Sequence, residues 1–420
     1  MALGCAIARL FFVSQGESLA GRLASLVRIG DGILDRPAAL ELRCHGESAR
    51  IIFWTAQETM ATMLAVYVSG HGYGHATRVG EVLRALRRQE PAMPLSIVTS
   101  GPEGLYRRAV PGPFDFRAEA CDTGLAQKSA LVIDEEGTVG AWWRFQAGYA
   151  ERVSREASWL REAGAAVVLG DIPPLAFDAA AEAGVPSFAL ANFSWDWIYR
   201  HFAGRQPALH EAADRAAAAY ARCGLLLELP FAGDLEAFPA RTRIPLVARR
   251  PGVTRDDARR RLGVDGPVVL VSFGGLGLPG FDPAVLAEMP SFTFLVADAA
   301  GGLPSNVRVV GNTDLDRAAL EYVDLVGAAD VVVTKPGYGI VSDAIGAGTR
   351  MIYTDRGDFP EYPILVREMA QWLACEYVTN AQVLKGGFRA EIEAVIARPM
   401  PPPPPLDGAR RAAERILTVL

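Results

Sequence analysis

The sequence predicts an α/β protein with two Rossmann-like domains, each a parallel sheet covered by helices, facing each other across a cleft. Three observations lead to this fold class. The 420 residues exceed the roughly 250–300 that one hydrophobic core usually fills. Short apolar runs bounded by glycine alternate with amphipathic segments, as in sheets buried on both faces. The alternation then restarts, so we expect domains at residues 63–245 and 246–398 and a returning segment at 399–420.

In the first half, the run LAVYVS at 64–69 is continuously apolar, which is typical of a buried parallel strand. Residues 76–88 carry apolar side chains at helical spacing with arginines between them, which predicts an amphipathic helix. A loop-rich region is expected before residue 165. The remaining elements predicted here are strands at 95–99, 165–169, 186–191 and 225–229 and a helix at 175–183.

In the second half, Thr254 followed by Asp256 and Asp257 predicts the start of a helix over 254–262, because a hydroxyl caps the first turn and carboxylates suit the helix dipole. Residues 244–251 (IPLVARRP) are suited to an interdomain linker. The prolines at 401–405 predict a stiff strap, and a final helix over 408–420 could carry the chain back across both domains. The other predicted elements are strands at 268–273, 292–297, 307–310, 331–334 and 350–354 and helices at 318–326 and 340–347.

Residues 1–62 differ from the rest of the chain. Residues 1–13 are apolar but lack the basic start and the small-residue cleavage site of a signal peptide. Residues 14–57 show no sustained helical or strand period. We hypothesise that translation starts at Met60 or Met63, which would make the upstream segment mis-annotated or disordered. The alternative is an N-terminal extension of unknown use, and a native peptide from residues 14–57 in a mass spectrum would favour it.

Composition excludes several classes of protein. The net charge is −6, and no long run of Lys and Arg occurs, which argues against a nucleic-acid partner. The five cysteines are scattered and form no CxxC pair, so a reduced, cytoplasmic protein without a metal is expected. No apolar run reaches the roughly 18–20 residues of a transmembrane helix. The sequence does not indicate an oligomeric state.

The first candidate site is the turn Gly70-His71-Gly72-Tyr73-Gly74-His75, between the first strand and its helix. Glycines at such a turn let backbone and ligand approach closely, and the helix N-terminus offers free N–H groups. The spacing is GxGxG, and no acidic residue closes the second strand, so NAD binding is disfavoured. Two of the five histidines lie here, and a histidine at the mouth of a cleft is a natural general base. The alternatives are glycines used for packing and a histidine that only caps the helix.

Asp171 and the residues after the strand at 186–191 belong to the same half of the cleft. Asp171 ends a strand and could orient or charge-stabilise a histidine base, or it could merely cap the next helix. Asn192, Trp195 and Asp196 follow another strand, where cleft residues are expected. Aromatic rings stack on the apolar faces of sugars, although Trp195 and the neighbouring Trp197 could equally belong to the core.

The second half offers a complementary site. Gly274 and Gly275 end its first strand, so this turn could face the glycine turn of the first half. The segment Lys335-Pro-Gly-Tyr-Gly339 leads into a helix with Ser342. Backbone amides at that helix start can hold a diphosphate without a metal. Lys335 adds positive charge, or it is simply a solvated lysine at the end of a strand.

Several motifs, in order, resemble the N-terminal, glycosyltransferase-like half of plant L-arabinokinases and their stand-alone bacterial relatives. More distantly, the layout is similar to the family that includes MurG and other nucleotide-sugar glycosyltransferases, which implies a GT-B fold. The kinase half is missing and no GxxxxGK[ST] loop occurs, so a sugar kinase is not expected. The motifs that carry the resemblance are VSGHGYGHATR (68–78), GDIPP (170–174), ANFSWDWIY (191–199), VSFGG (271–275) and KPGYGIVSDA (335–344).

The resemblance implies transfer of a sugar from a nucleotide diphosphate donor, a UDP-sugar first among the candidates, to a hydroxyl acceptor. No other cofactor or metal is implied, and similarity to the MurG group favours inversion. Asp343 stands where relatives usually carry the glutamate that binds the donor ribose. Glu361 stands in a loop that touches the donor sugar in similar enzymes, and the alternative is a simple surface loop. The alternatives are a nucleotide-sugar epimerase and a non-catalytic nucleotide-sugar binding or sensor module. The predicted site comprises His75, His71 and Asp171 for catalysis; Gly274, Gly275, Lys335, Gly337, Tyr338, Gly339, Ser342, Asp343 and Glu361 for the donor; and Gly70, Gly72, Gly74, Asn192, Trp195 and Asp196 on the acceptor side.

Overall fold

The computed structural model describes residues 38–44, 47–53, 63–129, 131–274, 277–297 and 302–420. The chain divides into two compact units, Met1–Ala61 and Thr62–Leu420. In the first unit, strands β1 (Ala38–Cys44) and β2 (Glu47–Phe53) form an antiparallel hairpin. Residues 14–57 thus contain two strands, although the sequence shows no sustained strand period there. Met60 lies outside the described residues, and β3 begins at Met63.

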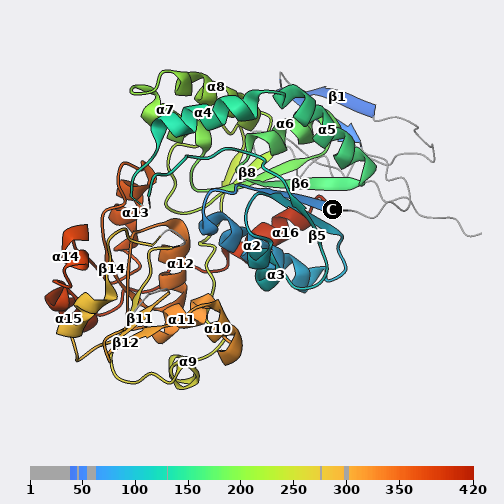
Figure 1. Cartoon of the computed structure of the whole chain (residues 1–420). Helices are drawn as coiled ribbons and strands as arrows, with labels where there is room; N and C mark the ends of the chain where they lie inside the picture. The colour runs from blue at the N-terminus through green and yellow to red at the C-terminus, as the bar shows by residue number, and fades with distance from the viewer. Residues whose placement is uncertain (1–37, 45–46, 54–62, 130, 275–276, 298–301) are drawn as a thin grey trace, which may run out of the picture. The chain divides into compact units, whose positions relative to one another are not determined.

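The second unit holds two parallel sheets, which confirms the predicted fold class (Figure 1). The first sheet has the order β5-β4-β3-β6-β7-β8-β9, and the second has the order β12-β11-β10-β13-β14-β15. In each sheet the chain runs outward from the first strand and then restarts on its other side, so both have a switch point, where ligands of open α/β sheets bind. The strands of the first sheet are β3 (Met63–Val68), β4 (Leu95–Thr99), β5 (Asp115–Ala118), β6 (Ala165–Asp171), β7 (Ser187–Ala191), β8 (Leu225–Glu228) and β9 (Arg241–Arg243).

Helices cover both faces of the first sheet because its buried strands present apolar side chains on both sides. Ala65 and Tyr67 of β3 face one cluster of buried residues, and Leu64 and Val66 face another. Figure 1 shows α4–α8 on one face and α2, α3 and α16 on the other. These helices are α2 (Tyr73–Gln89), α3 (Glu103–Ala109), α4 (Glu135–Gln146), α5 (Tyr149–Glu162), α6 (Pro174–Ala183), α7 (Trp195–Ala203), α8 (Ala208–Tyr220) and α16 (Gly408–Leu417).

The second sheet has the same layered construction. Its strands are β10 (Val268–Val271), β11 (Thr293–Val296), β12 (Val307–Val309), β13 (Val331–Thr334), β14 (Arg350–Tyr353) and β15 (Cys375–Tyr377). Its helices are α9 (Arg255–Leu262), η1 (Pro283–Glu288, a 3-10 helix), α10 (Asn312–Ala318), α11 (Tyr322–Ala328), α12 (Tyr338–Ala347), α13 (Glu361–Met369), α14 (Asn380–Leu384) and α15 (Arg389–Ala397).

Two local elements differ from the sequence predictions, and one predicted cap is confirmed. The helix expected over 318–326 is divided into α10 and α11, because Ala319 is left-handed (φ 50°) and the Asp324 carboxylate caps a new start by accepting from the Glu321 N–H at 2.7 Å. The region interpreted as loop-rich contains α4 and α5. Thr254 caps α9 as predicted, accepting from the Asp257 N–H at 3.3 Å.

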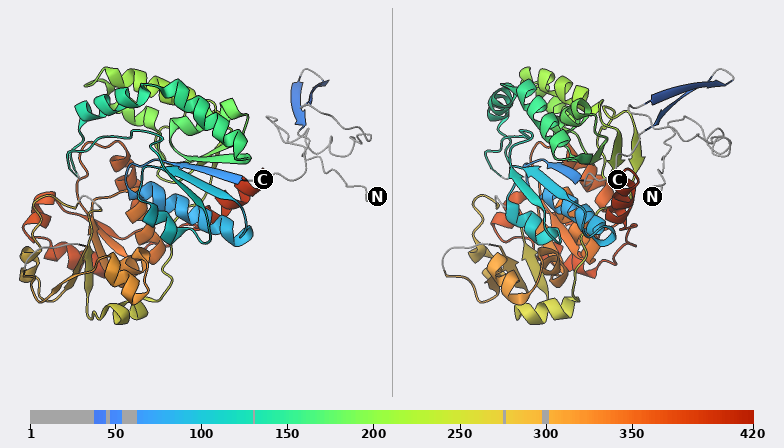
Figure 2. Two further views of the ribbon diagram at one scale, coloured as in Figure 1. Left: turned by 45° about the vertical axis from the view of Figure 1, so that its right-hand side comes forward. Right: turned by 90° about the vertical axis from the view of Figure 1, so that its right-hand side faces the viewer.

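Residues 244–251, which follow the first sheet, form a largely buried connection to the second sheet domain, here called the strut. Leu246 and Val247 in this segment are almost fully buried. Gly408, at the start of α16, lies against Pro245 so closely that a Cβ there would come within 2.0 Å of the Pro245 carbonyl oxygen. From this point α16 packs against α2, and Figure 2 shows the red C-terminal helix next to the blue part of the first sheet domain. Among the described residues, no helix is both long and apolar enough to cross a membrane.

Candidate functional site

The site is built at the switch point of the first sheet, between β3 and β6. The two strands are hydrogen-bonded neighbours, and the Ser69 N–H donates to the Asp171 carbonyl at 2.8 Å. The glycine turn therefore leaves β3 directly beside the end of β6. Gly72 has φ 80° and is the N-cap of α2, so the turn needs the left-handed conformation that glycine adopts readily. Gly70 meets the Ser100 side chain, which leaves no room for a Cβ.

His75 and Asp171 form a buried pair. His75 Nδ1 lies 2.9 Å from Asp171 Oδ1, and the two side chains are 5% and 0% exposed. Arg78 Nη2 also lies 3.0 Å from the same ring nitrogen. If Nδ1 accepted a hydrogen bond from Arg78, the lone pair of Nδ1 would also face Asp171 Oδ1, and the two would repel each other. The proton therefore belongs on Nδ1, which leaves Nε2 with a lone pair, as a general base requires.

Arg78 compensates the buried charge of Asp171. Its Nε donates to Oδ2 at 2.6 Å, and its Nη2 is hydrogen-bonded to Oδ1. Burial alone would raise the pKa of the Asp171 carboxyl, but the charges of Arg78 and His75, together with their hydrogen bonds, hold that pKa below its usual value. Asp171 is thus a carboxylate, able to hold the ring of His75 and stabilise its cation. The Arg78 guanidinium also lies over the Tyr338 ring, 5.3 Å from its centroid.

A chain of hydrogen bonds leads from Arg78 to the second sheet domain. Its Nη1 donates to Asn192 Oδ1 at 2.6 Å, and Asn192 Nδ2 donates to Glu361 Oε1 at 2.7 Å. The other oxygen of Glu361 accepts from Arg356 Nη1 at 2.6 Å. Both oxygens of Glu361 are therefore engaged, and the residue is 2% exposed. The structure places Glu361 as a link between the domains, so contact with a donor sugar would require it to release a partner.

Positive charge gathers at the start of α12. Gly337 is the N-cap of this helix, and a Cβ added there would lie 3.5 Å from Arg356 Nη1. Burial, and then the charge of Arg356, lower the pKa of Lys335 to about 8. Two side-chain cations thus flank a helix N-terminus, an arrangement suited to an anion. The Ser342 hydroxyl is directed back into the helix, where it donates to the Gly339 carbonyl at 2.9 Å.

The second-domain glycine that faces the first glycine turn is Gly339. A Cβ on Gly339 would lie 3.3 Å from the Cα of Gly74 and 3.4 Å from Thr77 Oγ1. The starts of α2 and α12 therefore approach each other backbone to backbone. Gly274 was expected in this place, but it is exposed and none of the described atoms lies within 4 Å of a Cβ added there. Gly275 lies outside the described residues.

His71 is half-buried and lies at the edge of the His75–Asp171 pair, called the dyad below. Its ring packs edge-on against Trp195, with centroids 5.3 Å apart. Burial, and then the charges of His75, Arg356 and Lys335, lower the pKa of His71 to about 3. His71 is therefore neutral and a weak base, so its geometry favours hydrogen bonding to a ligand over taking the place of His75.

Trp195 and Asp196 lie in the core at the start of α7. Trp195 is 0% exposed and packs among Phe193 and Tyr199, while its Nε1 donates to Asp122 Oδ2 at 2.8 Å. Such a ring cannot offer its face to a sugar, so the core alternative holds for Trp195. Burial raises the pKa of the Asp196 carboxyl, which points away from a role in charge stabilisation.

Asp343 is tied to the interdomain strut. Arg249 forms a two-pronged ion pair with it, through Nε–Oδ1 at 3.0 Å and Nη2–Oδ2 at 2.5 Å. Arg249 in turn lies over the Tyr322 ring, whose hydroxyl is 2.7 Å from Ser272 Oγ. Ser272 immediately precedes Phe273 and Gly274. The carboxylate expected at a donor ribose is thus present near the second switch point, with Arg249 as a partner.

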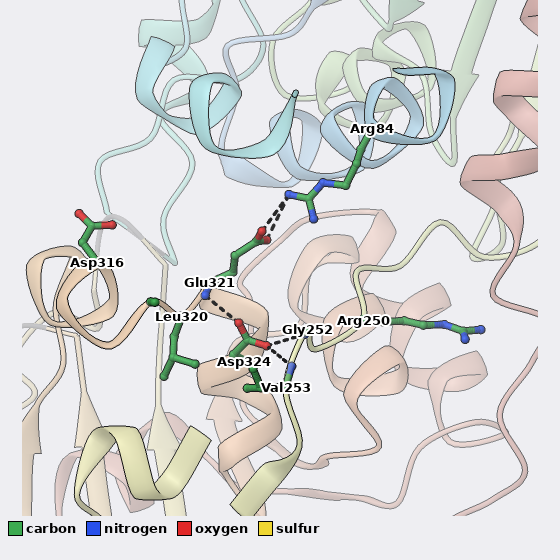
Figure 3. A pocket seen from close by; sticks show the side chains of 9 residues that line it. Arg84, Arg250, Gly252, Val253, Asp316, Leu320, Glu321 and Asp324 are labelled. Carbon is green, nitrogen blue, oxygen red and sulfur yellow. Dashed lines mark hydrogen bonds and ion pairs between the residues drawn. The ribbon is translucent and has the colours of Figure 1, made fainter. Parts of the chain in front are cut away.

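A polar groove lies apart from the dyad, beside the C-terminal half of α2 (Figure 3). Its volume is about 460 Å³. Arg84 pairs with Glu321 at 3.1 Å, and Asp324 accepts from the Gly252 N–H at 2.6 Å. These groups satisfy one another, and the Arg250 side chain points away from them in Figure 3. The groove is therefore a junction between the two sheet domains rather than the place of the chemistry.

Sequence reasoning missed Arg78 and Arg356. Both stand inside segments that had been singled out, Arg78 at the end of the first glycine motif and Arg356 in the loop before Glu361. A helical spacing of three residues from His75 was the available signal for Arg78. For Arg356 the sequence held no signal, because its place at the α12 N-terminus depends on tertiary structure.

Comparison with known proteins agrees with this architecture. The chain is 30% identical over 344 residues to L-arabinokinase of Arabidopsis thaliana, covering 80% of this chain but 32% of that protein. It is 26% identical over 305 residues to UDP-N-acetylglucosamine--N-acetylmuramyl-(pentapeptide) pyrophosphoryl-undecaprenol N-acetylglucosamine transferase of Clavibacter michiganensis subsp. michiganensis, covering 69% of this chain and 76% of that one. No protein-family model matches the chain. The predicted resemblance to both groups is confirmed.

Solved structures decide the fold. The glycosyltransferase of kitacinnamycin superposes with a TM-score of 0.57 at 19% identity, covering 85% of this chain and 99% of that one. UDP-glucose: anthocyanidin 3-O-glucosyltransferase in complex with UDP superposes with a TM-score of 0.53 at 12% identity, covering 86% and 93%. The fold is GT-B.

In this GT-B fold, four of the five arabinokinase-like motifs contribute residues where the two sheet domains meet. The motifs at 68–78 and 170–174 supply the dyad, and the motif at 191–199 supplies Asn192. The motif at 335–344 supplies Lys335 and the start of α12. These four motifs therefore lie close together in the fold, although Trp195 and Asp196 of the motif at 191–199 belong to the core.

Proposed function

We propose that this chain is a glycosyltransferase, which moves a sugar from a nucleotide diphosphate donor to a hydroxyl acceptor. The single observation that carries the proposal is the His75–Asp171 pair beside the N-termini of α2 and α12. A base and an anion site lie together, and this reaction needs both. The similar protein from Clavibacter is named for a transfer from UDP-N-acetylglucosamine, which supports a UDP-sugar as the donor here.

In the proposed reaction, His75 Nε2 removes the proton of the acceptor hydroxyl as its oxygen attacks the anomeric carbon. The bond from that carbon to the diphosphate oxygen breaks, and the nucleoside diphosphate leaves with the electron pair. Asp171 stabilises the imidazolium that forms. Lys335, Arg356 and the amides at Gly337–Gly339 balance the charge on the diphosphate. Attack from the side opposite the leaving group gives inversion, and no metal is required in this scheme.

Asp343 is included in the proposal as the ribose ligand. Its ion pair with Arg249 leaves the carboxylate lone pairs that do not face the guanidinium. A ribose diol could therefore bind to the pair as a unit, accepting from Arg249 while donating to Asp343.

The first test is a thermal-shift panel of UDP-, GDP-, ADP- and dTDP-sugars on the full chain, with His75→Ala and Asp343→Ala as variants. A ligand that binds the native state raises the melting temperature by mass action. We expect a shift with one nucleotide-sugar that is lost in Asp343→Ala and kept in His75→Ala. Absence of any shift in the folded wild-type protein would contradict the proposal.

Catalysis is then separated from binding. With the donor identified, an acceptor screen followed by mass spectrometry should show sugar transfer by the wild type. Loss of a general base typically lowers the rate about 10²–10⁴-fold, so we expect that loss in His75→Ala with donor affinity unchanged. Donor turnover without an acceptor to an isomeric sugar would instead identify an epimerase, and binding without turnover would identify a sensor module.

A further inference from the structure

A buried series of hydrogen bonds, Arg78–Asn192–Glu361, connects the surroundings of His75 in the first sheet domain to a loop of the second. Arg78 stands three residues after His75 on α2, so both side chains project from the same face of the helix. Its guanidinium spans two partners, holding Asp171 with Nε and Nη2 and Asn192 with Nη1. The positions of Asp171 and Asn192 are thereby fixed relative to each other.

Asn192 transmits this constraint in one orientation only. Its Oδ1 accepts from Arg78, and its Nδ2 donates to Glu361. A flipped amide would turn its NH₂ group toward the guanidinium and its oxygen toward the carboxylate, so that both contacts would become repulsive. Asn192 is 0% exposed, and solvent cannot substitute for either partner.

Glu361 stands at the first turn of α13, in the second sheet domain, and the loop before it rests on the first. Asp358 of this loop is bonded to His201 and Arg205 of the first domain, each at 2.5 Å. Gly357 is left-handed (φ 76°), and a Cβ on it would lie 2.1 Å from the Leu131 carbonyl oxygen. The position of Glu361 thus depends on apposition of the two sheet domains.

We propose that Arg78, Asn192 and Glu361 are positioning residues, which make the alignment of the His75–Asp171 dyad depend on the second sheet domain. The proposal rests on the function proposed above in naming His75 as the base. When the domains separate, Asn192 loses the short bond to Glu361 and keeps only the longer contact of its Nδ2 with the Phe231 carbonyl at 3.4 Å, so it holds Arg78 less firmly. The carboxylate of Asp171 is then held less firmly, and His75 is no longer confined to the Nδ1–H tautomer. The base is therefore assembled only while the donor-side loop is in place.

The test measures the tautomer of His75 in the full chain, without substrate. The protein is labelled with ¹⁵N-histidine, the His75 ring signals are assigned with His75→Gln, and long-range ¹H–¹⁵N spectra report which ring nitrogen carries the proton. We expect the Nδ1–H form in the wild type. In Asn192→Ala the ratio of Nδ1–H to Nε2–H should fall about fivefold or more, the change expected for the loss of one net hydrogen bond.

Glu361→Gln should also lower the ratio, because the single amide oxygen of glutamine cannot accept from both Asn192 and Arg356. The matched control is Asp358→Asn, the same kind of substitution in the same loop, at a residue that also bridges the domains but has no bond to Asn192. Its ratio should stay near that of the wild type, because the pairs of Asp358 with His201 and Arg205 are exposed and the close contact of Gly357 with Leu131 still holds the loop. In the double variant Asn192→Ala/Glu361→Gln, the second change should add nothing, because the link is already cut.

Three results would overturn the proposal: an Nε2–H tautomer in the wild type, an unchanged ratio in Asn192→Ala, or equal effects of Asp358→Asn and Glu361→Gln. If Asn192→Ala does not fold, Glu361→Gln and its control carry the test alone. Since no donor or acceptor is used, failure of the proposed sugar transfer would leave this measurement interpretable.

Discussion

Arg78 shows how much one buried side chain holds together in this protein. It is 4% exposed, and its charge offsets the carboxylate of Asp171, which has no exposed surface. Leaving one partner of a buried ion pair unpaired costs more than the pair contributes, because the remaining charge keeps its desolvation penalty. The stability of the first sheet domain and the hydrogen bonding of His75 therefore depend on the same guanidinium.

We expect Arg78→Met to lower the free energy of unfolding by about 3–5 kcal/mol, the typical effect of stranding a buried charge. Arg84→Met is the control, because Arg84 lies on the same helix but pairs with the half-exposed Glu321, and such pairs contribute about 0–1 kcal/mol. Urea denaturation followed by circular dichroism compares the two. Equal losses of stability would show that Asp171 tolerates burial alone.

Lys335 predicts a pH dependence of donor binding. Its pKa is lowered to about 8 by burial and by Arg356, so it is cationic below that pH and neutral above it. Affinity for UDP should therefore be highest near pH 7 and fall as the pH rises through about 8. A lysine with an ordinary pKa would keep its charge to about pH 10, so affinity would not change in this range. Lys335→Arg should bind UDP with a flat profile over this range. Calorimetry from pH 6.5 to 9.5 distinguishes them, and a flat wild-type profile would exclude Lys335 from the anion site.

At the scale of elements, the path of the loop between β14 and α13 depends on Gly357, which is left-handed and lies against the Leu131 carbonyl. Gly357→Ala would combine a left-handed backbone with a Cβ only 2.1 Å from the Leu131 carbonyl oxygen. Strain of about 1–2 kcal/mol and an overpacking cost of about 1–3 kcal/mol should therefore add, and Arg356 should move from the start of α12.

Gly280→Ala supplies the matched control for this loop. Gly280 has nearly the same φ, 77°, and none of the described atoms lies within 4 Å of its added Cβ. Gly280→Ala should therefore lose only the stability that the left-handed backbone costs an alanine, and its affinity for UDP should be unchanged. Thermal melting and UDP affinity measure both effects, and equal losses in the two variants would mean that the contact with Leu131 is unimportant.

The elements that the sequence could predict are those whose signal is local. The strand at 64–69 and the capped helix starting at Thr254 depend on neighbouring residues alone. The break between α10 and α11 could not be predicted, because Ala319 is an alanine in a conformation that alanine rarely adopts. In the candidate site, by contrast, His75 and Asp171 could be paired from the sequence, because each follows a predicted parallel strand. The partners Asn192 and Glu361 come from different domains, and only the folded chain brings them together.

At the scale of the whole molecule, one hydrophobic cluster extends through both sheet domains. It includes Val66 of β3, Leu246 of the strut, Val332 of β13 and Ile416 of α16. The two domains are therefore not independent cores joined by an exposed linker, and α16 stabilises a sheet domain from which it is distant in sequence.

Ile416→Ala should destabilise the first sheet domain. Removing a buried isoleucine typically costs about 2–5 kcal/mol, and Ile416 is 0% exposed beside α2. Hydrogen–deuterium exchange should show faster uptake in α2, although the substitution lies in α16. Arg415→Ala, at an exposed neighbour, should leave that uptake unchanged. Faster exchange confined to α16 itself would show that the helix is dispensable to the sheet.

The return of α16 to α2 also bears on how the chain is made. During synthesis, domains usually fold in order as they leave the ribosome. Here the apolar face of α2 receives its covering helix only after the entire second sheet domain has been translated. The first domain must therefore wait with part of its core open, and the nascent chain should depend on chaperones until α16 emerges. A gene cut between the two sheets would leave that surface permanently uncovered, so the halves of this protein are not separable modules.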